Sequence, residues 1–214
     1  MKIIFSRKGF DSQNGKIPNP ILPDGTMLSL PIPSEGDENC YESLKYGDLT
    51  YFQIIKQLNS RYDFKVKYCH LDPDLREDAK VRMKGWTPTF GQMVQSLSHL
   101  HNQGVGKGDI FLFFGRFRRT MLTNGVLQYD KKSPIVHVIY GYLQIEKEYD
   151  VKNDILPGWL KDHPHASYTE TLNSICWIQA DNATSFKSKF VNCLNFCKGV
   201  IYPNLFLGLE FKMF

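Results

Sequence analysis

The feature that most constrains this chain is the segment at residues 110–114, IFLFF, which is apolar at five consecutive positions. A strand with one face in water alternates apolar and polar residues, so a continuous apolar run indicates a strand that is buried on both faces. Turn residues 106–109 precede the run, and the polar stretch GRFRR follows it. We therefore expect a sheet with this strand at its centre.

Other strands are expected around this one. Residues 2–5, 64–75, 134–151 and 174–180 contain β-branched and aromatic residues, and the first part of 64–75 alternates apolar and lysine positions. Asn124-Gly125 fits the type I′ turn of a hairpin, and Gly141 marks a bulge or a close backbone approach. The segment 17–33 holds five prolines around Asp24-Gly25, which predicts an irregular hairpin and excludes a helix.

Two helices are predicted from apolar residues that recur on one face. Residues 46–61 form the first, with Asp48 or Thr50 as its N-cap. Residues 91–103 form the second, with Gly104 at the position of a C-cap. From Ser185 onward the periodicity is lost, and the pattern predicts no particular structure.

Composition and charge place limits on the class of protein. At 214 residues, 42% apolar and 22% charged, the sequence predicts a single globular α+β domain over residues 1–214. A net charge of +4 permits a nucleic-acid partner without requiring one. Five cysteines without paired spacing indicate reduced thiols, and no apolar stretch is long enough to span a membrane, so a cytoplasmic location and no membrane partner are expected. The oligomeric state is not predicted.

The first candidate site follows the first strand. Ser6, Arg7, Lys8 and Asp11 could surround a phosphate or carboxylate, since arginine offers a planar pair of donors to such groups. The glycine spacing does not fit a Walker loop. The alternative is an ordinary solvated turn.

The second candidate site is the segment HLDPD. His70, Asp72 and Asp74 occupy alternating positions, which point to one side of an extended chain. Together with His163 and His165 they form a mixed nitrogen and oxygen set that suits a divalent zinc, manganese or iron ion and a water-activating hydrolase. The alternative is that the aspartates cap a turn and the histidines bond to backbone. No cofactor other than this metal is indicated.

The third candidate site is GRFRR at the end of the central strand. Arg116 and Arg118 share one strand face, with Phe117 on the other. Nucleic-acid grooves combine cations for phosphate with aromatic rings for bases. A solvent-facing strand end is the alternative. No nucleophile elbow or catalytic triad is evident.

Several segments together resemble the nucleotide modification associated domain 3 family of bacterial and phage proteins. The segments are SRKGFDS, the proline-rich hairpin, HLDPD, FGQ, QGVGKGDIFLFFGRFR and HPHASYTETLNSICWI. The resemblance covers residues 1–178, whereas residues 179–214 diverge from the family pattern. It implies a role in DNA base modification or defence, and so a nucleotide or nucleic-acid partner.

The order of helix, GDIFLFF, hairpin and HVIYGYLQI is also similar to PUA-like folds. This similarity implies a mixed β-barrel or curled sheet with two to four flanking helices, and an aromatic pocket for a modified base. Trp86, Trp159 and Trp177 are the candidates for stacking on that base, although each also suits the core.

Three functions remain open. The favoured one is a module that recognises a modified nucleotide, using Lys8, Arg116 and Arg118 for phosphate and tryptophan for stacking. The alternative is an enzyme on the same ligand, either metal-assisted or using Asp72 as general base and His70 as acid. A structural or partner-binding protein is the third, with the C-terminal VIYPNLFLGLEF as its apolar surface.

Overall fold

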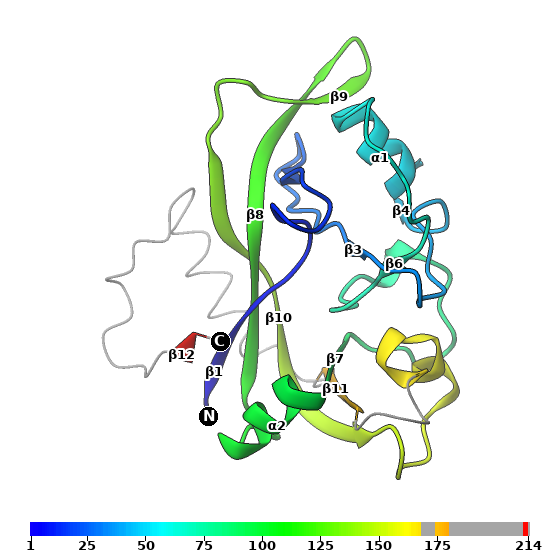
Figure 1. The fold of residues 1–214 in the computed structure, drawn as a ribbon, viewed down its shortest axis with the longest axis vertical. Coiled ribbons are helices and arrows are strands. Elements are labelled where there is room, and N and C mark those ends of the chain that lie inside the picture. Colours follow the sequence, from blue (N-terminus) through cyan, green and yellow to red (C-terminus); the bar gives the residue numbers. More distant parts are fainter. Residues whose placement is uncertain (168–173, 180–211, 214) are drawn as a thin grey trace.

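The long strand β8 (Ile110–Thr123) lies inside the main sheet and runs along most of the length of the molecule (Figure 1). The computed structural model describes residues 1–167, 174–179 and 212–213. On one side β8 pairs in parallel with β1 (Ile3–Arg7) and then with β2 (Asn19–Ile21). On the other side it pairs antiparallel with β10 (Ile135–Asp150) and then with β9 (Val126–Tyr129). The expected central strand and the strands at residues 2–5 and 134–151 are confirmed.

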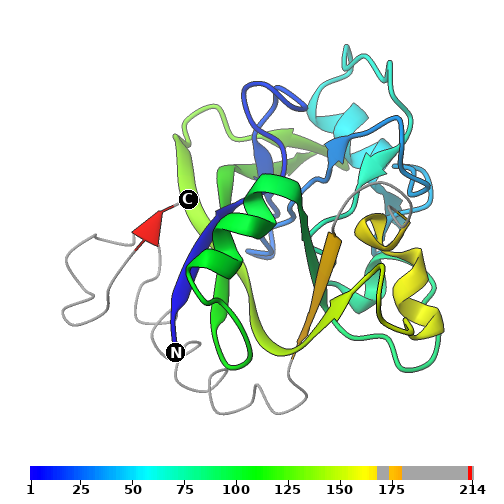
Figure 2. The same cartoon turned by 60° about the horizontal axis from the view of Figure 1, so that its bottom comes forward.

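The main sheet has the order β12-β1-β8-β10-β11-β7, in which β12 is Lys212–Met213, β11 is Ser174–Gln179 and β7 is Thr89–Met93. It is curled, and α2 (Val94–Asn102) lies on its inner side between β1 and β7 (Figure 2). Over the described residues the sheet does not close into a barrel. The expectation of an α+β protein with a curled sheet and two helices is confirmed, and the barrel alternative is wrong because the edge strands of this sheet, β12 and β7, do not pair.

Helix α1 (Tyr51–Leu58) begins at the expected cap. Thr50 accepts a hydrogen bond from the Gln53 amide, and the Gln53 side chain accepts one from the Thr50 amide, which is a complete capping box. Helix α2 begins later than expected, because Gly91, Gln92 and Met93 pair with β11 and belong to β7. Its C-terminal end is near Gly104, which has a φ of 62°.

The short elements connect the sheet to α1. They comprise β3 (Ile32–Pro33), β4 (Lys45–Tyr46), β5 (Leu49–Thr50), β6 (Cys69–His70) and the 3₁₀ helices η1 (Glu77–Ala79), η2 (Gly158–Asp162) and η3 (Pro164–Ala166). Of the strand expected at residues 64–75, only β6 forms, and it pairs with β3. The Asp24-Gly25 turn forms as expected, and Asn124-Gly125 turns between β8 and β9 with both residues at positive φ.

Side chains of β1 and β8 alternate between two apolar clusters. On the inner face Ile4, Phe111 and Phe113 pack with residues of α2, β7 and β11. On the outer face Phe5 and Phe114 pack beside the buried residues of a smaller cluster. A separate core surrounds α1 and the proline-rich segment. Among the described residues, no helix is both long and apolar enough to cross a membrane.

Candidate functional site

The carboxylate of Asp72 is the centre of a buried polar cluster. Its side chain has no exposed surface, and its Oδ2 atom lies 2.8 Å from the Nζ atom of Lys8. Its Oδ1 atom accepts a hydrogen bond of 2.8 Å from the Gly91 amide. The Nε2 atoms of His163 and His165 lie 3.5 and 3.7 Å from the two oxygens. Asp72 is thus the meeting point of four chain segments.

Charge and burial act in opposite directions on Asp72. Burial by itself would raise the pKa of this carboxyl, but the Lys8 ammonium and the two imidazoles outweigh it and hold the pKa well below its usual range. Burial lowers the pKa of His165 despite the nearby carboxylate. Near neutral pH Asp72 is therefore ionised and His165 is neutral.

A second pair of contacts extends the cluster to His70. The Nε2 atoms of His70 and His165 face each other at 3.2 Å, and His70 Nδ1 lies 2.9 Å from Asp37 Oδ2. Burial would raise the pKa of Asp37, but hydrogen bonding from His70 outweighs it and the pKa is lowered. The ionised Asp37 therefore accepts the Nδ1–H of His70, which leaves Nε2 of that ring directed at His165.

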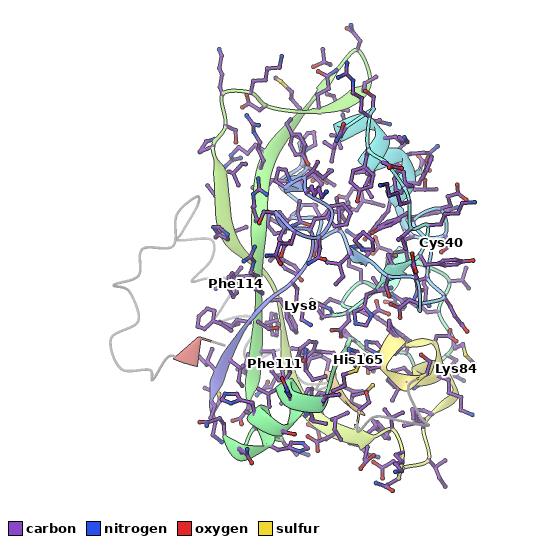
Figure 3. All side chains as sticks on the ribbon, viewed as in Figure 1. Lys8, Cys40, Lys84, Phe111, Phe114 and His165 are labelled. Atoms are coloured by element: carbon purple, nitrogen blue, oxygen red, sulfur yellow. The ribbon has the colours of Figure 1, made fainter. Side chains whose placement is uncertain are left out.

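The local sequence explains why these groups converge. Lys8 follows β1, His70 ends β6, and His165 lies in η3 (Figure 3). A Cβ atom on Gly91 would lie 2.3 Å from the His165 ring, so β7 can approach that ring only with glycine at this position. His163 caps η3 by accepting the His165 amide at Nδ1, which places its Nε2–H toward Asp72.

A groove of about 580 Å³ opens beside this cluster, at the seam between β1 and β7. Lys8 borders both, because its ammonium contacts Asp72 and lies 4.5 Å from the centre of the Phe90 ring. The groove is lined by both apolar and polar residues. Its lining comes from residues 4–8, Phe90, Gln92, Gln95, Ser96, His99, Leu100 and Phe111.

Of the residues expected to bind phosphate, Ser6, Arg7 and Lys8 line the groove, whereas Asp11, Arg116 and Arg118 are not part of its lining. Arg7 and Arg116 continue the outer row of β1 and β8, since each follows an outer-face residue by two positions. Arg7 also lies 3.5 Å from Asp11, in an ion pair. Arg118 donates to the carbonyls of Ser133 and Lys131, which fixes a turn.

Asp74 does not join the histidines. Both of its oxygens accept hydrogen bonds of 2.6 Å from Arg82, whose guanidinium stacks on Trp86. Trp86 and Trp159 line a cavity of about 10 Å³, which has room for one water molecule. Trp177 is fully buried in the inner core.

Sequence reasoning did not identify four residues of the site, which are Asp37, Gly91, Gln92 and Gln95. Asp37 is only 6% exposed and contacts His70. Gly91 gave a signal that could have been used, because a glycine inside a strand often marks a close backbone approach. Gln92 reaches the groove from β7, through the pairing of β7 with β11 that no local pattern indicates, and Gln95 reaches it from the first turn of α2.

The fold and the site define a class of α+β protein with a curled mixed sheet, a groove at the seam of the sheet and a histidine–aspartate cluster behind the groove. Comparison with protein families then places the chain more closely. The family model of nucleotide modification associated domain 3 matches residues 2–197, so the chain belongs to that family. The match continues past residue 178, where the resemblance in the sequence was expected to end. No curated protein and no solved structure matches the chain.

Proposed function

We propose that this chain is a nucleotide-binding module that holds one nucleotide in the groove at the β1–β7 seam. The family indicates involvement in nucleotide modification systems. The observation that carries the proposal is the position of Lys8, a cation in the lining of a groove that also contains apolar side chains and the amide side chains of Gln92 and Gln95. Ligand sites of this kind are largely apolar, with a few polar groups that set orientation.

The size and chemistry of the groove fit a nucleoside unit. A volume of about 580 Å³ lies within the range of small-molecule sites. Gln92 and Gln95 carry both a donor and an acceptor, which is what the edge of a base requires. The apolar residues of the lining provide a surface on which a flat base or a deoxyribose packs.

Two features favour an anionic group at the same place. An ammonium has three donors, and the Nζ atom of Lys8 uses one of them for Asp72. Helix α2 also begins at the groove, and its N-cap residue Met93 makes no side-chain capping bond. Amides in the first turn of such a helix attract phosphate oxygens. The groove therefore suits a nucleotide better than an uncharged nucleoside.

Calorimetric titration with deoxynucleoside 5′-monophosphates and the matching nucleosides tests the proposal. We expect the monophosphates to bind about tenfold or more tightly than the nucleosides, since hydrogen bonds to a charged group exceed about 1.4 kcal/mol. Gln92→Ala should lose about three- to tenfold in affinity, whereas Gln13→Ala, on an exposed loop, should bind like the parent protein. Absence of binding by every nucleotide, or equal binding by Gln92→Ala, would contradict the proposal.

The likeness to PUA-like domains stays a prediction. The recognition of a modified base that this likeness implies can be measured by the same titration when modified nucleotides are included. In those domains an aromatic pocket holds the base. Trp86 and Trp159 flank a cavity of about 10 Å³, which has no room for a base between them. We therefore propose the seam groove as the place of the base, with Lys8 rather than Arg116 or Arg118 next to the phosphate.

An enzyme that acts on the same ligand is the second candidate function. It is favoured by the contact of Lys8 with both the groove and the cluster of Asp72, His70 and His165. A metal-free reaction with Asp72 as general base is the weaker form, because a carboxyl with a strongly lowered pKa accepts protons poorly near neutral pH. Catalysis by this cluster therefore favours a bound metal. The third function, partner binding through VIYPNLFLGLEF, falls outside the described residues.

A further inference from the structure

The imidazoles of His70 and His165 meet nitrogen to nitrogen beside the buried carboxylate of Asp72. Their Nε2 atoms face each other at 3.2 Å, and Asp72 Oδ2 lies 3.7 Å from the same nitrogen of His165. The three potential ligand atoms all lie within 4.8 Å of one another. Two segments that are far apart in the chain supply them, residues 70–72 and η3, so the convergence is a property of the tertiary fold.

These separations are close to those around a tetrahedral metal ion. Zinc binds imidazole nitrogen and carboxylate oxygen at about 2.0–2.2 Å, which places neighbouring ligand atoms about 3.3 Å apart. The distance between the two histidine nitrogens is 3.2 Å, and small side-chain rotations would bring Asp72 to bonding distance. Two histidines and one carboxylate leave further coordination positions open, as in catalytic zinc and non-haem iron sites.

Each of the three groups is oriented by a second contact. Asp37 accepts from Nδ1 of His70, which is the carboxylate–histidine arrangement that holds metal-binding imidazoles. The hydroxyl of Ser174 lies 3.4 Å from Nδ1 of His165. The Gly91 amide holds Oδ1 of Asp72, which leaves Oδ2 directed at the site. The three ligand atoms are thus left facing one another, while Asp37, Ser174 and the Gly91 amide contact the other polar atom of each side chain.

We propose that His70, His165 and Asp72 bind a divalent first-row transition-metal ion, and that this ion competes with Lys8 for Oδ2 of Asp72. The same oxygen contacts the Lys8 ammonium at 2.8 Å, so a cation bound there weakens or displaces that ion pair. When the ion pair with Asp72 is broken, Lys8 still lines the groove, and the ammonium donor that Asp72 had accepted becomes available to a ligand. The metal site does not depend on nucleotide binding, and a metal titration tests it without any nucleotide.

The experiment is a competition titration of Zn²⁺ against a chromophoric chelator with metal-free protein. The parent protein should bind one equivalent of Zn²⁺ more than His70→Ala, since that variant keeps every cysteine and differs only in one ligand. His137→Ala removes an exposed histidine of β10 and should bind like the parent protein. Equal stoichiometry and affinity in the parent protein and His70→Ala would overturn the metal site.

Two further variants keep the test decisive if His70→Ala folds poorly. Asp37→Asn retains the ligands and alters only the contact to His70, so Zn²⁺ affinity should fall about 10- to 100-fold. Lys8→Met removes the competing cation, so affinity should rise about tenfold or more. Co²⁺ in place of Zn²⁺ should give visible absorption bands of a low-symmetry site in the parent protein and not in His70→Ala. Unchanged affinity in Asp37→Asn would count against the site, and unchanged or weaker affinity in Lys8→Met would refute the competition with Lys8.

Discussion

At the scale of single residues, Lys8 and Asp72 depend on each other. The Asp72 side chain is fully buried, and Lys8 is the cation that contacts it within 3 Å among the described residues. A buried charge that loses its partner costs much more than the pair contributes, because the remaining ion is desolvated without compensation. Lys8 also borders the groove, so the stability of the fold and the chemistry of the site are linked here.

Replacing Lys8 and Asp72 separately and together tests this dependence. Lys8→Met should lower the free energy of unfolding by about 3–5 kcal/mol, because it leaves a buried carboxylate unpaired. The double variant Lys8→Met, Asp72→Asn should be more stable than Lys8→Met alone, since the amide needs no cation. Chemical denaturation of the four proteins measures the coupling. A double variant less stable than Lys8→Met would show that the pair is not the reason for the loss.

At the scale of elements, Asn19 joins three segments that have no regular pairing with one another. Its side chain accepts from the amides of Phe10 and Leu30 and donates to the carbonyls of Phe10 and Arg116. The side-chain amide of Asn19 is fully buried and makes all four of the hydrogen bonds that it can make. The proline-rich segment is thereby fixed against β8, although prolines remove many of its own backbone donors.

Asn19→Ala should therefore be strongly destabilising. Four buried backbone groups lose their partner, and each unsatisfied group costs about 1–3 kcal/mol, so we expect a loss of about 3 kcal/mol or more. Asn14→Ala, in an exposed turn, is the matched control and should stay within about 0.5 kcal/mol of the parent protein. Thermal or denaturant unfolding gives both values. A loss at position 19 as small as that of the control would disprove the role of Asn19.

Elements whose signal is local were predicted from the sequence. The apolar run of β8 and the cap of α1 are properties of neighbouring residues, and both formed as expected. The start of α2 was wrong because Gly91 to Met93 pair with β11, a partner about 80 residues away in the chain. For the site, His70, Asp72, His163 and His165 were recognised by their chemistry, whereas Asp37 depends on how a loop folds back. The alternating positions of Asp72 and Asp74 predicted that both would lie in one site. In the structure the chain turns between them, and Asp74 accepts hydrogen bonds from Arg82 instead.

At the scale of the whole molecule, β8 connects two cores that share few other elements (Figure 1). Near its start, Phe111 and Phe113 belong to the inner core with α2. Near its end, β8 pairs with β9, whose Leu127 belongs to the core around α1. Because strands flank β8 on both sides along most of its length, opening β8 requires both cores to separate. Local unfolding of either end is expected to leave the other end of the strand paired.

Amide hydrogen exchange of the native protein should follow this architecture. We expect the amides of residues 110–117 to exchange last, at the rate of global unfolding, because they lie between β1 or β2 and β10 and their side chains include the most buried in the molecule. The amides of α1 should exchange earlier, since this helix has eight residues and packs on the second core alone. Mass spectrometry of peptides from the two regions compares them directly. If α1 were protected as long as β8, the two cores would unfold as one unit, and β8 would not be the element that joins two separable parts.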